Sequence, residues 1–175
     1  PPHQRDARTK GVPALGSGAV FQISEADISC NPFEIPKHFK RLYGFDVGWN
    51  NTACAWGAYD AEADVIYVTH TYKRGQAEPA THAQAIKERG DWILGAIDPA
   101  SRGRAQADGE QLIALYRGQG LNLILADNAV EAGIFDMYER MATGRLKVFS
   151  SCFEFFAEYR LYRRDEKGKI VKQND

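Results

Sequence analysis

The chain has 175 residues, of which 44% are hydrophobic and 26% charged, and this length suits one sizeable domain with extensions. Its 22 Lys and Arg against 23 Asp and Glu give a net charge of -1, which excludes a global basic field, so any binding of nucleic acid needs a local patch. The three cysteines, Cys30, Cys54 and Cys152, lack CxxC or Cys/His ligand spacing, which argues against a zinc site and favours reduced thiols in a reducing cytosol.

Residues 1–40 are rich in proline and glycine, which leaves room for little beyond a short strand at residues 19–23. We therefore expect a linker or lead-in ahead of the domain. The chain begins without Met, and both of its ends look cut from something longer. It has no apolar run long enough to span a bilayer and does not open with a charged-then-apolar signal segment.

The pattern changes after this lead-in to three hydrophobic strands. They are expected at residues 42–47, 52–59 and 64–72, and residues 60–63 form the turn between the last two. Because the connections are short, we expect three consecutive antiparallel strands.

Helices and strands then alternate to the end of the chain. Two helix starts carry capping signals, Asn128 with Glu131 and Ser151 with Glu154, and Asp108 with Gln111 resembles a third cap. The elements expected in this part are a helix from Pro79 to Gly90, a strand at 92–97, a helix capped at Asp108, a strand at 121–125, a helix from Asn128 to Gly144, a strand at 146–149, a helix from Ser151 to Leu161 and a final hairpin or tail turning at 165–168. The predicted order is βββ-α-β-α-β-α-β-α.

Two carboxylates stand at strand ends in this scheme, Asp46 and Asp98. A carboxylate flanked by Phe45 and Val47 is costly to bury unless it is paired, and a divalent metal is the usual partner. An Asp at a strand end before Gly also commonly starts a hairpin turn, so Asp46 alone leaves both interpretations open. Neighbouring strands place their ends a few ångströms apart, so Asp46 and Asp98 together could hold one or two hard cations. Paired metals suit phosphodiester cleavage, because one activates water while the other stabilises the departing oxygen.

This order of elements, with an acid after the first strand and another after the fourth, is similar to the ribonuclease H-like fold. That α/β fold has a mixed central sheet in which three antiparallel strands are followed by alternating helices and parallel strands. The segments 43–49, 96–103 and 158–164, the last leading into 172–175, resemble the nuclease domain of tailed-phage large terminases of the headful-packaging type. The segments 8–13 and 16–21 resemble the stretch that joins the packaging ATPase to the nuclease in such phages.

The resemblance implies a metal-dependent endonuclease that cleaves concatemeric double-stranded viral DNA during packaging into procapsids, with Mg²⁺ or Mn²⁺ as cofactor, one or two ions. Residues 1–40 would lead in from a missing ATPase domain, and residues 41–175 would form the nuclease domain, with its C-terminus truncated or disordered. No GxxxxGK(S/T) loop occurs, so the motor is expected elsewhere. The implied partners are double-stranded DNA, the ATPase domain, the small terminase subunit and the portal protein, without a membrane, in the cytoplasm of the infected host and not in the mature virion.

The third acid of the site is open at this stage. Terminase nucleases usually continue, after a segment like 172–175, into a helix whose Asp completes the metal triad, whereas this chain stops at Asp175. Either Asp175 begins that motif, or Asp175 itself serves as the third catalytic and metal-binding acid. Asp127 and Glu158 are possible additional acids, although Asp127 also suits a helix cap and Glu158 an ion pair with an arginine.

Residues 160–172, near the C-terminus, form a basic arm that supplies the local patch that DNA binding needs. An ordinary solvated hairpin is the alternative for the same residues. Together with two arginines that follow Asp98, the candidate phosphate ligands are Arg102, Arg104, Arg160, Arg163, Arg164, Lys167, Lys169 and Lys172.

Two other functions fit parts of the sequence. Another ribonuclease H-like nuclease, such as a junction resolvase or a transposase-like enzyme, would share the carboxylates but not the lead-in. A metal-free module that docks DNA or the portal would keep the fold without needing the acids.

Overall fold

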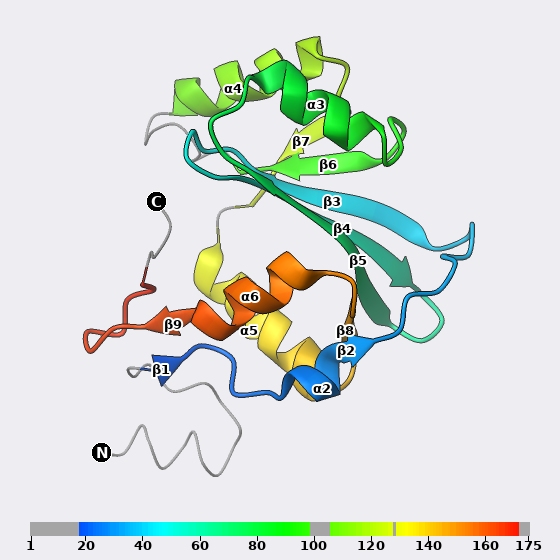
Figure 1. Ribbon diagram of the computed structural model, residues 1–175, viewed down its shortest axis with the longest axis vertical. Coiled ribbons are helices and arrows are strands. Elements are labelled where there is room, and N and C mark those ends of the chain that lie inside the picture. Colours follow the sequence, from blue (N-terminus) through cyan, green and yellow to red (C-terminus); the bar gives the residue numbers. More distant parts are fainter. Residues whose placement is uncertain (1–17, 99–105, 128, 172–175) are drawn as a thin grey trace.

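The computed structural model describes residues 18–98, 106–127 and 129–171, and these ranges contain nine strands and five helices (Figure 1). The first half of the chain contains β1 (Gly18–Ala19), α2 (Glu25–Ile28), β2 (Ser29–Cys30), β3 (Lys40–Asp46), β4 (Thr52–Asp60), β5 (Val65–Arg74) and α3 (Pro79–Lys87). The second half contains β6 (Leu94–Ile97), α4 (Gln106–Gly118), β7 (Leu123–Leu125), α5 (Val130–Ala142), β8 (Leu146–Phe149), α6 (Phe153–Leu161) and β9 (Arg163–Arg164). None of the helices within the described ranges has the length and apolar character needed to cross a membrane.

The central sheet has seven strands in the order β2-β8-β5-β4-β3-β6-β7. The neighbouring strands β3, β4 and β5 are antiparallel, while β6, β7, β8 and β2 join in parallel pairs on either side. This mixed sheet confirms the expected ribonuclease H-like fold class. Because β4 runs opposite to its two neighbours, the C-terminal ends of β3, β5 and β6 all reach the same edge of the sheet.

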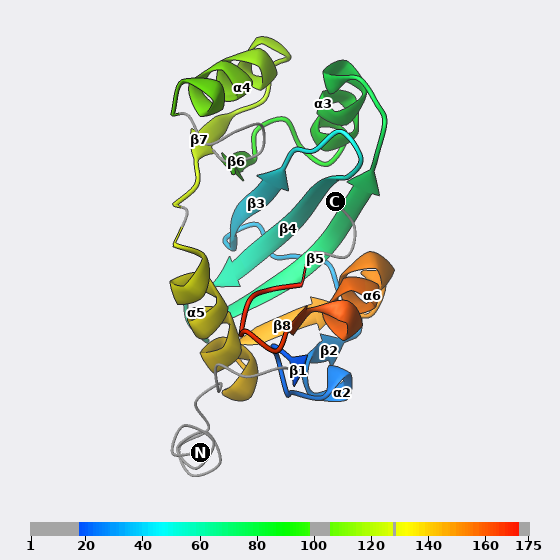
Figure 2. The same ribbon diagram turned by 90° about the vertical axis from the view of Figure 1, so that its left-hand side faces the viewer.

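The two faces of the sheet carry different helices. Tyr43 and Phe45 of β3 are buried against α3 and α4, and the ring of Phe45 meets that of Tyr116 edge-on at 4.9 Å. On β5, the Tyr72 hydroxyl lies 2.8 Å from Nδ1 of His82 on α3, whereas Thr71 bonds to α6. Since side chains alternate along a strand, α3 and α6 lie on opposite faces of β5. Figures 1 and 2 show α3 and α4 at one end of the molecule and α5 and α6 at the other.

The segment before β3 contributes more to the fold than a lead-in would. β2 pairs in parallel with β8 at the edge of the main sheet, and β1 pairs with β9. Val20, Phe21 and Ile28 are buried in a hydrophobic core that they share with residues of α5, β8 and α6. The expectation of little beyond a short strand before residue 40 is therefore wrong for residues 18–39, because these apolar side chains pack against segments that are distant in sequence.

Two of the expected helix caps do not form. α4 already includes Asp108, so this residue is not its cap. The N-cap of α6 is Cys152, whose side chain makes no capping bond, and the Glu154 carboxylate instead accepts a hydrogen bond of 2.7 Å from the Thr71 hydroxyl. α5 starts after Ala129, also without a side-chain cap, and the expected cap Asn128 lies outside the described residues. The helix from Pro79 begins where it was predicted.

Candidate active site

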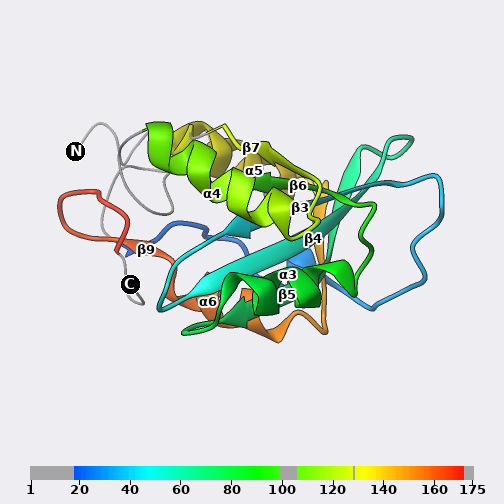
Figure 3. The ribbon, with the colours of Figure 1, turned by 90° about the horizontal axis from the view of Figure 1, so that it is seen from above.

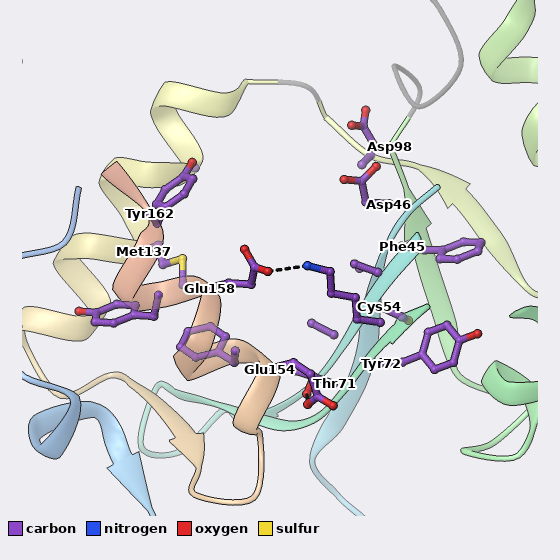
Figure 4. A pocket seen from close by; sticks show the side chains of 18 of the residues that line it. Phe45, Asp46, Cys54, Thr71, Tyr72, Asp98, Met137, Glu154, Glu158 and Tyr162 are labelled. Atoms are coloured by element: carbon purple, nitrogen blue, oxygen red, sulfur yellow. Dashed lines mark hydrogen bonds and ion pairs between the residues drawn. The ribbon is translucent and has the colours of Figure 1, made fainter. Parts of the chain in front are cut away.

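Asp46 and Asp98 lie side by side at one edge of the sheet. Asp46 is the last residue of β3, and Asp98 follows β6 directly. The two strands are parallel neighbours in which Phe45 pairs with Ile97, and the Asp98 amide donates to the Phe45 carbonyl at 2.9 Å. Strands in such a pair are about 4.8 Å apart, so the two carboxylates can share a ligand. Figure 4 shows both side chains at the same side of a cavity.

Because side chains alternate between the two faces of the sheet, Asp46 and Asp98 lie on the face opposite to α3 and α4, called the open face below. Phe45 and Ile97 are buried against the helices on the other face, so the next residue of each strand points away from them. Asp46 is exposed and Asp98 is half-buried, so the expected cost of burying a mid-strand carboxylate does not arise. The adjoining surface carries only small side chains from three strands, Gly44, Ala53, Ala55 and Ala96.

A cavity of about 610 Å³ lies between this open face and the helices α5 and α6. Asp46 and Asp98 line it from the sheet, with Thr71 and Lys73 from β5. The walls formed by the helices are Val130, Gly133, Ile134 and Met137 of α5 and Glu154, Phe155, Glu158 and Tyr159 of α6. Figure 4 shows Met137 and Tyr162 across the cavity from Asp46. The small sheet residues thus leave room for a ligand directly beside the carboxylate pair.

Two polar contacts cross the cavity from β5 to α6. The Lys73 ammonium donates to the Glu158 carboxylate at 2.5 Å, an interaction that Figure 4 draws as a dashed line. The Thr71 hydroxyl bonds to Glu154, and this bond lowers the pKa of the Glu154 carboxyl from its ordinary value. Glu158 therefore faces the same cavity as Asp46 and Asp98, and the partner of Glu158 is a lysine where the sequence indicated an arginine.

The other candidate acids are placed differently. The Asp127 carboxylate accepts a hydrogen bond of 3.2 Å from the Ala129 amide at the start of α5, and Asp127 is not among the residues that line the cavity. Asp127 therefore bonds to the turn that leads into α5, whose N-cap Ala129 receives no side-chain cap, so Asp127 is not the cap of this helix. Asp175 lies outside the described residues. Within residues 18–98, 106–127 and 129–171, no group of three or more His, Cys, Asp or Glu side chains is arranged to hold a metal ion.

The basic arm divides into exposed and paired side chains. β9 leads into a hairpin that turns at residues 165–168, as expected, and Figure 3 shows this hairpin projecting at one end of the molecule. Three basic side chains on it are exposed, those of Arg163, Lys167 and Lys169.

The two other arginines of the arm hold the fold together. Arg164 is only 8% exposed and donates to both oxygens of Glu131, at 3.1 and 2.7 Å, and to the Gly168 carbonyl. Arg160 forms a two-bond pair with Glu25 at 2.6 and 2.7 Å, which ties α6 to α2. We therefore remove Arg160 and Arg164 from the candidate phosphate ligands, because these guanidinium groups already pair with carboxylates. Arg102, Arg104 and Lys172 lie outside the described residues.

Lys73 is a functional candidate that the sequence reasoning did not single out. Asp46 pairs with Ala53, and Ala53 pairs with Lys73, so the three lie in one row across β3, β4 and β5. The signal was present in the sequence, because Lys73 stands near the end of the third strand. The C-terminal ends of the first and third strands of an antiparallel meander meet at the same edge.

These features define a class of protein: a ribonuclease H-like domain with two carboxylates at the ends of neighbouring parallel strands. The family model of the terminase RNaseH-like domain matches residues 43–175, and the chain belongs to this family. Over its whole length the chain is 38% identical to the terminase large subunit of Salmonella phage P22, and it spans 37% of that protein's length.

Solved structures agree with this assignment. The chain resembles the nuclease domain of the P22 large terminase with a TM-score of 0.83 and 37% identity, over 93% of this chain and 88% of that domain. The large terminase nuclease of the thermophilic phage G20c, solved with bound magnesium, matches with a TM-score of 0.58 and 18% identity, over 93% of this chain and 90% of the other. At that identity the second likeness supports the fold alone.

Proposed function

We propose that this chain is a divalent-metal-dependent endodeoxyribonuclease domain that cuts concatemeric double-stranded viral DNA during genome packaging. The observation that carries the proposal is the carboxylate pair, Asp46 and Asp98, which adjacent parallel strands bring to one edge of a cavity. Membership of the terminase RNaseH-like domain family supports the same activity and substrate.

The carboxylate pair fits a hard divalent cation, and we propose Mg²⁺ or Mn²⁺, one or two ions. When bound, such a cation would lower the pKa of an attacking water and stabilise the departing oxygen. Asp46 and Asp98 would hold and orient it from the sheet. We retain Asp175 as the proposed third ligand, with Glu158 as the alternative, because Glu158 lines the same cavity from α6. Loose metal binding is expected from two carboxylates alone, since each ligand adds charge and a coordination position.

The partners follow from the family and are proposals for this chain. The relative in phage P22 is a terminase large subunit of which this chain spans 37%, which leaves length for an ATPase domain in the same polypeptide. We propose double-stranded DNA, that ATPase domain, the small terminase subunit and the portal protein as partners, in the cytoplasm of the infected host and not in the mature virion.

Cleavage of supercoiled plasmid tests this function. The chain should convert plasmid into nicked and linear forms with Mn²⁺ or Mg²⁺ and should stop when EDTA removes the metal. Binding of plasmid without cleavage in either metal would instead support the metal-free docking module. Selective cutting of four-way junctions over linear duplex would support a resolvase, since packaging nucleases act on ordinary duplex.

The exposed part of the basic arm should control the salt dependence of DNA binding. Lys167→Ala with Lys169→Ala removes up to two phosphate ligands, so the slope of log affinity against log salt should become shallower by about 0.9 for each phosphate that is no longer neutralised. Fluorescence anisotropy with duplexes of different sequence should show the same weakening for all of them, because phosphate contacts carry no sequence information.

A second double variant provides the matched control for the arm. Lys37→Ala with Lys40→Ala removes two exposed positive charges at and before the start of β3, at the opposite edge of the sheet from Asp46. Its salt slope should stay at the wild-type value. Equal slopes for the arm variant and the wild type would assign the hairpin to a protein partner and leave DNA to be held elsewhere.

A further inference from the structure

Lys73 is a cation built into the cavity at the level of the carboxylate pair. It lies in the same row as Asp46, two strands away, which corresponds to about 10 Å between the backbones. Ala53 stands between them and is too small to separate the two side chains. Lys73 and Asp46 therefore both face the cavity from the sheet.

Helix α6 holds Lys73 in this position through two matched contacts. Thr71 and Lys73 are two residues apart on β5, and their partners Glu154 and Glu158 are four residues apart on α6. Two strand residues span about 6.8 Å and four helix residues about 6 Å, so the two contacts fit one alignment of helix and strand. The Lys73 side chain is 29% exposed and that of Glu158 49%, so the pair is in contact with solvent.

The cavity is acidic, so a cation in it would offset the negative charge of its lining and of bound DNA. Four carboxylates line the cavity, those of Asp46, Asp98, Glu154 and Glu158. A DNA strand would bring further negative charge to this place. Lys73 is the only Lys or Arg among the residues that line the cavity in the described part of the chain. An ammonium has three N–H donors, and the bond to Glu158 uses one of them.

We propose that Lys73 binds a non-bridging oxygen of the phosphodiester that is cut at Asp46 and Asp98, and that Glu158 is the positioning residue that holds Lys73 over the cavity. This inference rests on the proposed nuclease function and adds the group that holds the reacting phosphate. The oxygens of that phosphate gain negative charge during cleavage, so a fixed ammonium stabilises the transition state more than the bound substrate.

Replacement of Lys73 separates this role from general DNA binding. Lys73→Met should lower kcat for plasmid cleavage in Mn²⁺ by about 100-fold, the size of effect seen when one fixed donor to a developing charge is removed. The affinity for duplex in Ca²⁺ should change little, since one phosphate among several is affected. Lys73→Arg keeps the charge and should restore part of the kcat. Arg74→Met removes the same charge from the next residue, whose side chain points to the other face, and should keep the wild-type kcat.

Glu158→Gln distinguishes positioning from metal binding. If Glu158 acts only through Lys73, Glu158→Gln lowers kcat by less than Lys73→Met, and the double variant equals Lys73→Met, because neighbours in one interaction are not additive. The rise in melting temperature caused by MnCl₂ should be the same in Glu158→Gln as in the wild type. Loss of that rise would make Glu158 a metal ligand and overturn its positioning role.

The proposal and the nuclease function fail in different ways. A wild-type kcat in Lys73→Met would overturn the role of Lys73 while cleavage by the wild type still supports the nuclease. If the wild-type chain shows no metal-dependent cleavage, the proposed function fails, and the role of Lys73 fails with it.

Discussion

Asp46→Asn is expected to abolish metal-dependent cleavage of plasmid and to remove the rise in melting temperature that MnCl₂ causes. The change removes one charge and one ligand from the proposed metal site, and Asp98 with the proposed third ligand cannot hold a hard cation tightly. Without metal, the melting temperature should stay the same or rise, because the substitution relieves repulsion between Asp46 and Asp98. Asp98→Asn should behave in the same way. Thermal melting with and without MnCl₂, beside the cleavage assay, measures both effects.

Asp127→Asn is the matched control for this prediction, since it makes the same change at another aspartate that lies shortly after a strand. Asp127 bonds to the start of α5 and does not line the cavity, so this variant should keep most of the cleavage activity. Equal loss of activity in Asp127→Asn and Asp46→Asn would show that Asp127 belongs to the metal site. A large fall in the melting temperature of Asp46→Asn without metal would make Asp46 a structural residue.

The sheet and its carboxylates were predictable from local patterns. In β3, buried residues such as Tyr43 and Phe45 alternate with exposed ones. The turns between β3, β4 and β5 are short, so these strands can pair only in an antiparallel arrangement. Because an acid after each of two parallel strands must reach the same sheet edge, the position of Asp46 beside Asp98 follows from strand order alone. The role of this pair as metal ligands is still a prediction.

The contacts between distant segments were not predictable in the same way. Ser151 and Glu154 have the spacing of a capping box, but Glu154 bonds to Thr71, which is 83 residues away in sequence. Arg164 stands in a basic run that resembles a solvated arm, yet it is buried against Glu131 of α5. In both cases a partner supplied by the tertiary fold competes with a local one, and a periodic pattern contains no information on that partner. The packing of residues 18–30 against α6 and β8 has the same origin.

Gly95→Ala is expected to destabilise the domain strongly. Gly95 of β6 pairs with Tyr43 of β3, and a Cβ at position 95 would overlap the Tyr43 ring, 2.6 Å from its hydroxyl oxygen. Tyr43 is 1% exposed and cannot move without displacing the core under α3 and α4. Overpacking of a core costs about 1–3 kcal/mol, and the upper end of this range corresponds to a fall in melting temperature of roughly 6–12 °C for a chain of this size. Differential scanning calorimetry measures the change.

Gly44→Ala is the control that separates steric overlap from the backbone effect of replacing a glycine. Gly44 lies in β3 and pairs with Ala96, the residue after Gly95, but a Cβ at position 44 would have no atom within 4 Å. Its melting temperature should therefore stay equal or rise, since alanine restricts the unfolded chain more than glycine does. Gly95→Ala should also weaken plasmid cleavage, because Asp98 follows three residues later on the displaced strand. A Gly95→Ala variant with the stability of Gly44→Ala would show that β6 can move away from Tyr43 at little cost, and the strand that presents Asp98 would then not be rigidly held.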